Sequence, residues 1–375
     1  MQMSNSRRVR EHGAASLIVV IFSILLLVTV SLGFIRLVIR DQQRTIDDEL
    51  SRGAYDAALA GVEDGKRILQ ACVAQGDAGA CNAITANKCN SVHRAKILSA
   101  ADSNSNEDEV FLKSSAGTAG ETYDQAYTCV KVQRDTQSYE GKLTADTSRI
   151  IPLDTVGNFS QITVSWYKKP SLSVLNLPTV STPTLPPLAE WVTGTNIVRP
   201  PIVRVQLIQY NNGNFNLDHF DQSGGGNTLY LYPANAGATS LSFVADGRRT
   251  GTDDLLKYVK CDDVTPYVCS VVLTLTDPVG GSAATRKAYL RVTSIFGDTQ
   301  FSVQANGTML HDVQPAVDAT GRASDVFRRI KANVELESPF DIYPRATVDI
   351  TKNFCKDFSV SADAYMPGSC DATQP

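Results

Sequence analysis

The sequence predicts an α+β protein: a long N-terminal α-helix, transmembrane and then amphipathic, followed by a β-rich, disulfide-tied antiparallel globular region. Three features predict this class, namely one long apolar run, glycine and alanine at helical spacing behind it, and short alternating segments bounded by turn residues in the second half. With 375 residues, of which 43% are hydrophobic and 20% charged, the chain can build packed domains.

The apolar run extends from Ala14 to Ile35 and has the length of a membrane-spanning helix, which needs about 20 residues. A cleavable secretory signal has a shorter apolar core, about 7–15 residues, followed by a small-residue cleavage site. Here Arg36 and Arg40 follow inside a continuing helical pattern, so we exclude the ordinary signal peptide. The basic residues before the run favour the cytoplasm for the N-terminal flank.

Helical spacing continues after the apolar run to about Ala71. Apolar residues recur on one side of this predicted helix: Ile46, Leu50, Ala54, Ala58, Val62, Leu69 and Val73. Small residues form a second stripe at intervals of four: Gly53, Ala57, Gly61 and Gly65. Because a glycine in an exposed helix costs about 1 kcal/mol relative to alanine, this stripe predicts a close backbone approach. The approaching backbone belongs either to the chain's own globular part or to a partner helix.

All eight cysteines follow the apolar run, and their wide spacing differs from the closely paired ligands of zinc sites. An even number of cysteines behind an export segment predicts disulfides, which persist on the oxidising outer side of the membrane. Two pairs bracket short loops, Cys261 with Cys269 and Cys355 with Cys370. The other four allow three pairings, among which the sequence does not choose: Cys72, Cys81, Cys89 and Cys129.

The remaining chain divides by composition. Residues 72–130 are small, polar and cysteine-rich, and "SQITVSWYKK" alternates like a strand. A proline-dense stretch then predicts an extended linker before a β-rich half. Strand candidates in that half are "IVRVQLIQY", "NTLYLYP", "LSFVADG", "YVCSVVLTLTD", "KAYLRVTSIF", "TQFSVQA", "DVFRRIKANVELE" and "RATVDIT".

Charge and motifs exclude several function classes. Residues 1–40 hold five arginines and one acid, so the rest of the chain carries about −8, which disfavours nucleic acid as a partner. The four histidines are isolated, and no hydrolase, nucleotide-binding or zinc-protease motif occurs. We therefore expect no catalytic residue, no metal and no cofactor, and the chain is not predicted to be an enzyme.

The N-terminus resembles that of type IV prepilins, with a closer likeness to minor pilins of the PilX type. A short basic leader ends at Gly13, "HGAASLIVV" opens the apolar helix, and "RGAYDAALAGVEDGKR" occupies the place where the family typically reads like "AFQAAEAGLR". This likeness covers about the first 70 residues. Further on, "ASDVFRRIKANVE" resembles the arginine-bearing penultimate strand of pilins, and the Cys355–Cys370 loop resembles their C-terminal disulfide loop.

The resemblance implies that a prepilin peptidase cuts after Gly13 and leaves Ala14 as the new N-terminus. Residues 14–35 would then lie in lipid of the inner membrane, with the C-terminal region outside, and later pack among other pilin subunits in an extracellular filament built by the pilus assembly machinery. Major pilins begin with Phe or Met and carry a glutamate five residues in, where this chain has Ala14 and Ile18. This departure favours a minor subunit.

The predicted organisation has five parts: a prepilin-type leader (1–13), a long helix (14–71, transmembrane over 14–35), a cysteine-containing first lobe (72–177), a proline-rich linker (178–201) and a β-rich C-terminal lobe (202–375). The predicted function is that of a minor pilin whose exposed lobe serves adhesion or pilus assembly. Two alternatives stay open: a single-pass, membrane-anchored surface adhesin, and a pseudopilin of a secretion system.

Overall fold

The computed structural model describes residues 12–96, 109–112, 124–171, 173–179, 191, 197–211, 226–243, 256–263, 266–280 and 286–335. These residues belong to one compact unit, Met1–Leu336. The predicted strand "RATVDIT" and the pair Cys355 and Cys370 lie outside the described residues.

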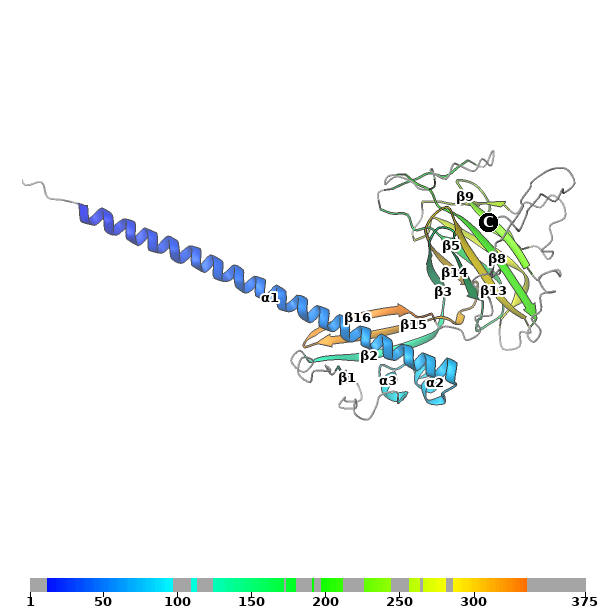
Figure 1. The fold of residues 1–375 in the computed structure, drawn as a ribbon, viewed down its shortest axis with the longest axis horizontal. Coiled ribbons are helices and arrows are strands. Elements are labelled where there is room, and N and C mark those ends of the chain that lie inside the picture. Colours follow the sequence, from blue (N-terminus) through cyan, green and yellow to red (C-terminus); the bar gives the residue numbers. More distant parts are fainter. Residues whose placement is uncertain are drawn as a thin grey trace, which may run out of the picture. The chain divides into compact units, whose positions relative to one another are not determined.

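The chain begins with one continuous helix, α1 (His12–Gln75), of 64 residues and about 96 Å (Figure 1). No proline interrupts it, and it ends where Gly76 adopts a φ of +68°, the left-handed conformation that commonly terminates helices. The Asp77 N–H then donates to the Ala71 carbonyl at 3.0 Å, which satisfies a carbonyl of the last turns. The predicted long helix is confirmed and extends a few residues further at each end.

Two short helices follow, α2 (Ala78–Thr85) and α3 (Ser91–Arg94). The Asp77 carboxylate accepts a hydrogen bond from the Ala80 N–H at 2.9 Å and so caps α2. The buried side chains of these helices pack against the end of α1 and against β2, so this part of the small, polar and cysteine-rich range 72–130 contributes to the core.

An antiparallel four-stranded sheet packs against the C-terminal half of α1, and we call it the helix-bearing sheet (Figure 1). Its strands, in spatial order, are β1 (Val110–Phe111), β2 (Gln125–Thr136), β15 (Leu310–Ala323) and β16 (Val326–Asn333). Its core joins Ile68 and Leu69 of α1 to Val130 of β2 and Val317 of β15, all of them fully buried.

The other large sheets pack face to face as a β-sandwich. The first sandwich sheet has the order β10 (Ser240–Ser242), β12 (Cys269–Val279), β5 (Phe159–Trp166), β14 (Thr299–Ala305) and β3 (Ser138–Leu143). The second sandwich sheet has the order β11 (Leu256–Lys260), β9 (Gly226–Ala234), β8 (Ile202–Asn211), β13 (Arg286–Ile295) and β4 (Ser148–Pro152). A separate parallel pair joins β6 (Val174–Leu175) to β7 (Ile197–Val198).

One hydrophobic core fills the space between the two sandwich sheets. Trp166 and Phe301 of the first sheet and Leu207 and Leu290 of the second are each at most 1% exposed. The Trp166 indole N–H donates to the Pro201 carbonyl at 3.0 Å, which satisfies its polar group inside the core.

The sandwich is inserted into the helix-bearing sheet. Strands β3 to β14 all lie between β2 and β15 in sequence, whereas β2 and β15 are direct neighbours in the sheet. Strands from the predicted lobes 72–177 and 202–375 therefore share sheets; β5, for example, pairs with β12 and β14. The sheets divide the chain at about residues 137 and 309 rather than at the proline-rich range 178–201.

Most predicted strands occur, but the structure differs from the prediction in three ways. Strand β10 is shorter than "LSFVADG" suggested, and the pairs β9–β11 and β10–β12 are parallel, so the sandwich is mixed rather than purely antiparallel. The longest strand, β15, was not predicted at all. It contains Pro315 and has irregular pairing between His311 and Ala316, features that hide a strand from periodicity.

Candidate functional site

The small-residue stripe of α1 faces the helix-bearing sheet at very short range. A Cβ atom built on Gly65 would lie 2.5 Å from Val317 Cγ1, and one built on Gly61 would lie 3.1 Å from the nearest atoms of Val130 and Ala319. Of the two alternatives for this stripe, the structure therefore supports contact with the chain's own globular part. Gly53 at the edge of the contact faces the Gln125 side chain.

A glycine of the sheet completes the contact from the other side. A Cβ atom on Gly321 of β15 would lie 2.2 Å from the Ala58 nitrogen, 2.3 Å from the Ala54 oxygen and 2.8 Å from the Ala57 carbonyl carbon. These are main-chain atoms, which cannot turn aside as a side chain can. Helix and strand thus touch backbone to backbone, and Gly321 carries no recognisable signal in the sequence.

Polar contacts join the helix to the sheet on both sides of this apolar contact. The Tyr127 hydroxyl donates to the Asp64 carboxylate at 2.5 Å, and the Arg328 Nε donates to Ser51 Oγ at 2.8 Å. A shallow, open hollow lies beside this second contact and is lined by Ser51, Arg52, Tyr55, Asp56 and Arg328.

The members of the predicted apolar stripe that contact the sheet are buried, whereas the side chains of Ile46 and Val73 are 53% and 39% exposed.

The N-terminal half of α1 lies outside the body of the protein. Every side chain from Leu17 to Glu49 is exposed, and the apolar ones include Leu26, Phe34 and Leu37 at 64–66%. This helix is long and apolar enough to cross a membrane. The predicted processing residues, Gly13 and Ala14, lie in the first turn of α1.

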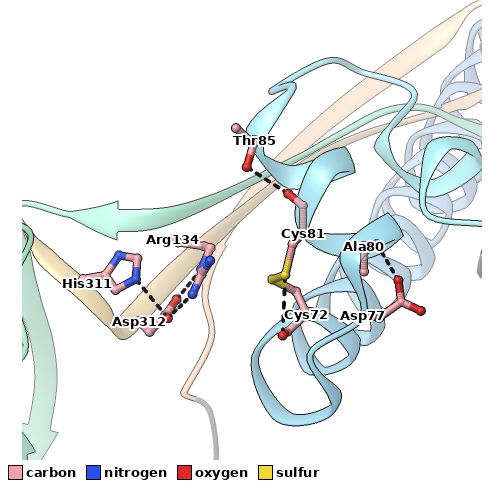
Figure 2. The surroundings of a disulfide bond; sticks show 8 residues. All are labelled: Cys72, Asp77, Ala80, Cys81, Thr85, Arg134, His311 and Asp312. Atoms are coloured by element: carbon pink, nitrogen blue, oxygen red, sulfur yellow. Dashed lines mark hydrogen bonds and ion pairs between the residues drawn. A yellow bond between two sulfur atoms is a disulfide. The ribbon is translucent and has the colours of Figure 1, made fainter. Parts of the chain in front are cut away.

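One disulfide fixes the C-terminal end of α1, and another ties the segment after α2 to β2. Cys72 pairs with Cys81, which ties α1 to α2 (Figure 2), and Cys89 pairs with Cys129 in the middle of β2. In a chain-entropy picture, closing loops with sequence separations of 9 and 40 stabilises the fold by about 3 and about 4 kcal/mol. The structure thus selects one of the three pairings that the sequence left open.

The third described disulfide lies in the sandwich. Cys261, directly after β11, pairs with Cys269 at the start of β12, which confirms the predicted pair. Because β11 and β12 belong to different sandwich sheets, this bond links the two sheets at one edge. All cysteines among the described residues are therefore paired.

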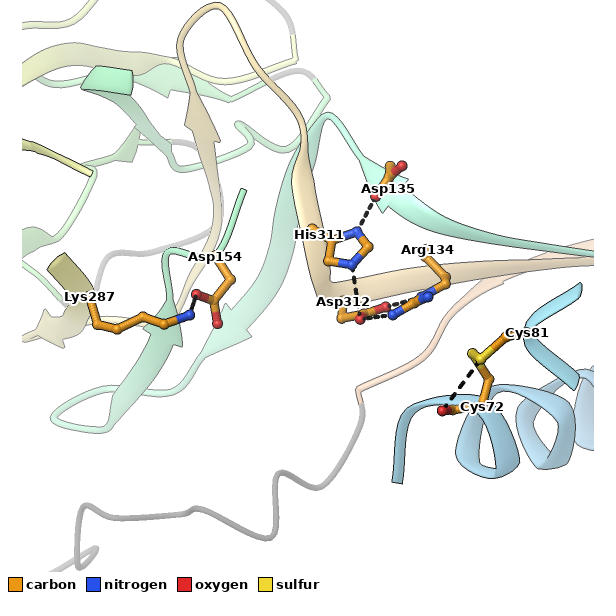
Figure 3. Close-up of polar contacts among 8 residues, drawn as sticks. All are labelled: Cys72, Cys81, Arg134, Asp135, Asp154, Lys287, His311 and Asp312. Carbon is orange, nitrogen blue, oxygen red and sulfur yellow. Dashed lines mark hydrogen bonds and ion pairs between the residues drawn. A yellow bond between two sulfur atoms is a disulfide. The ribbon is translucent and has the colours of Figure 1, made fainter. Parts of the chain in front are cut away.

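A cluster of charged side chains lies where β2 and β15 leave the helix-bearing sheet toward the sandwich (Figure 3). The Arg134 guanidinium binds both carboxylate oxygens of Asp312, one through Nε at 2.7 Å, and this bonding raises the pKa of Arg134. His311 lies between two carboxylates, with Nδ1 2.5 Å from Asp135 Oδ1 and Nε2 3.3 Å from Asp312 Oδ2. We interpret this cluster as a structural link between the two strands.

Neighbouring contacts also join strands at this boundary between the helix-bearing sheet and the sandwich, which we call the polar junction. The buried Gln314 amide donates to the Glu140 carbonyl and accepts from the Glu140 N–H, both at 2.8 Å. This side chain thus makes the two main-chain hydrogen bonds that a neighbouring strand would make. Glu335, after β16, accepts from the Tyr139 hydroxyl at 2.8 Å and from Arg149 at 2.5 Å. Desolvation and the Glu335 carboxylate raise the pKa of Tyr139 well above its ordinary value. None of these long-range pairs has a signal in the sequence.

Within the described part of the chain, no group of three or more His, Cys, Asp and Glu side chains is arranged to hold a metal ion. The expectation of a chain without metal, cofactor or catalysis stays a prediction. The chain matches no protein-family model, and no curated protein or solved structure is significantly similar to it.

We predict that Gly61→Leu lowers the unfolding temperature of the full-length protein in detergent. The added side chain overlaps Ala319, Val130 and Tyr127, and overpacking of this kind costs about 1–3 kcal/mol, more than the helix propensity gained. Gly33→Leu is the matched control, because nothing lies within 4 Å of a Cβ at that position. Equal melting of the two variants would show that the close approach contributes nothing to stability.

We predict that Arg134→Gln destabilises the protein by about 1 kcal/mol in urea unfolding, because it leaves the partly buried Asp312 carboxylate without its bidentate partner. The control is Lys260→Gln, which breaks the ion pair with Asp262, a pair whose two side chains are 46% and 53% exposed. The control should unfold at the same urea concentration as the parent. If both variants shift equally, the junction has no special role.

Proposed function

We propose that the chain is a minor subunit of a type IV pilus or a related filament, and that it displays its inserted β-sandwich at the cell surface or on the filament. Before assembly, residues 14–35 anchor the subunit in the inner membrane, with the sandwich on the outer side. In the filament the same segment packs among the helices of neighbouring pilin subunits. The partners are therefore pilin subunits, the assembly machinery and the prepilin peptidase.

The observation that carries this proposal is the dual environment of α1. One uninterrupted helix has an exposed apolar half and a half that packs on a sheet through glycines. A plain membrane anchor needs no helical continuity into the globular part, because any linker can join the two. A subunit that must place its globular part at a fixed distance from a packed helical core needs this continuous helix.

The inserted sandwich supports a display role. Its strands enter and leave through β2 and β15, so the helix-bearing sheet and α1 form a complete unit by themselves in the described residues. An addition of this kind leaves the helix that assembles unchanged while it adds surface for adhesion or assembly contacts. The outer-side location also agrees with three formed disulfides, which persist in oxidising compartments.

One observation favours a second candidate, a membrane-anchored surface adhesin that never enters a filament. Ile18 occupies the place of the glutamate that neutralises a neighbouring subunit's terminal amine in major pilins, and an amine without this partner is costly to bury. A minor subunit at or near the tip avoids much of this cost, because fewer neighbours surround its N-terminus. A pseudopilin of a secretion system differs from such a minor pilin only in the partners with which it assembles.

We predict that mass spectrometry of protein sheared from the cell surface finds a mature chain that begins at Ala14. A Gly13→Leu variant, which alters only the residue before the expected cut, should keep its leader and be absent from the sheared fraction. A Gly33→Leu variant is the control for cleavage alone: it should lose its leader as the parent does, which is measured on the membrane fraction because Gly33 belongs to the segment that packs in the filament. An intact Met1 in protein that stays with the membrane would instead support the anchored adhesin.

A further inference from the structure

The second sandwich sheet has a core face and an outer face. Along β8, Val203, Val205 and Leu207 are buried in the sandwich core, so Arg204 and Gln206 point to the opposite face. Along β13, Ala288, Leu290 and Val292 are in the core, so Arg291 and Thr293 share the outer face with Arg204. Two arginines therefore lie on the central strands of this face.

The register makes the two arginines diagonal neighbours. Arg204 is opposite Thr293, and Arg291 is two residues before Thr293 on the same strand. Hydroxyl groups connect them: Arg204 Nη2 donates to Thr293 Oγ1 at 3.3 Å, Thr293 Oγ1 donates to Ser148 Oγ at 3.1 Å, and Arg291 Nη2 donates to the same Ser148 oxygen at 3.1 Å. The pair thus occupies one small polar area.

Neither arginine has a carboxylate partner among the described residues. The two basic residues at the start of β13 do have carboxylate partners, since Arg286 pairs with Asp277 and Lys287 with Asp154. Moreover, the Nε atoms of Arg204 and Arg291 are both buried without a hydrogen-bond acceptor. Burial and the neighbouring charge of Arg204 lower the pKa of Arg291 from its ordinary value. Two partly buried like charges without an acid between them are unfavourable for the fold.

We propose that Arg204 and Arg291 form a binding site for a saccharide that carries a carboxylate or sulfate group. An oxyanion held between two guanidinium groups accepts several charge-assisted hydrogen bonds and cancels the mutual repulsion. Tyr230 lies opposite Arg204 on β9, and Tyr289 lies on the same face as Arg291. Partly exposed tyrosine rings beside an anion site offer flat apolar surface to a sugar ring.

Other anionic partners fit less well. A nucleic acid or a lipid surface is held by many phosphate contacts from a wide basic area, whereas this site is one pair of arginines on a chain of net charge −4. A single oxyanion on a small ligand or on one sugar of a polymer matches the size of the site. The proposal concerns the sandwich alone and does not require that the chain enters a filament.

The test is calorimetric titration of the full-length protein in detergent, at constant ionic strength, with sodium glucuronate, sodium glucose 6-sulfate and neutral glucose. We expect the parent to bind one or both acids with a dissociation constant of about 1–10 mM and to ignore glucose. The double variant Arg204→Gln/Arg291→Gln should bind the same acid at least about tenfold more weakly. The two acids show which oxyanion the site prefers.

The control is Arg286→Gln/Lys287→Gln, which removes the same charge from β13 and should bind like the parent. Equal binding by the arginine-pair variant and the parent, or no binding of either acid by the parent up to about 50 mM, would overturn the proposal. Thermal unfolding separates binding from folding. Because the pair repels, we expect its double variant to melt at or above the parent's temperature, whereas melting below the parent would assign the pair a structural role instead.

Discussion

The backbone contact between α1 and β15 is the constraint on which the rest of the helix-bearing part depends. Gly61 and Gly65 on the helix and Gly321 on the strand let the two main chains approach so closely that no Cβ fits at Gly65 or Gly321 without movement. Glycine lowers the stability of both a helix and a strand, so this cost must be recovered by packing. The fully buried Ile68, Leu69 and Val317 around the contact supply that packing.

The disulfides and the polar contacts at the sandwich boundary tie the strands that carry this contact. Near the end of α1, Cys72 is bonded to Cys81 of α2, and Cys89 is bonded to Cys129 of β2, so the segment after the helix is tied back to the sheet. At the sandwich end of β2, the Arg134–Asp312 pair holds the two strands together where the sandwich begins. Strand β2 is thus tied within its length, at Cys129, and at its sandwich end, at Arg134, so the inserted sandwich need not contribute to the packing of α1.

The sequence predicted what depends on local periodicity. The 64-residue helix, strand β5 and the core strands β8 and β13 all follow from apolar spacing, as did the Cys261–Cys269 pair from its short loop. The stripe of Gly53, Ala57, Gly61 and Gly65 correctly predicted a close approach but did not identify its partner, because spacing on one helix carries no information about the opposing surface. The N-terminal processing site and the function stay predictions.

What sequence reasoning missed depends on long-range pairing. Strand β15 begins with "LHDVQP", in which a proline and polar residues conceal the alternation, and its partner β2 precedes it by more than 170 residues. Without knowledge of that pairing, the insertion of the sandwich cannot be inferred from the sequence. The proline-rich segment is then the place where the sequence suggests a domain boundary. The same holds for Arg134 with Asp312 and for Arg204 with Arg291, whose proximity arises only from strand register.

The insertion of the sandwich places the two proposed roles, helix assembly and ligand binding, on different surfaces, and the two roles have conflicting requirements. A helix that assembles, as proposed for α1, must keep an apolar, shape-specific face, whereas a ligand-binding surface, as proposed for the sandwich, can tolerate unpaired like charges such as those of Arg204 and Arg291. With the sandwich core independent of the core beneath α1, destabilising features of a binding face do not weaken the packing of the helix. An unfavourable charge pair can therefore persist on the sandwich, because its cost is limited to a domain that has a large core and its own disulfide.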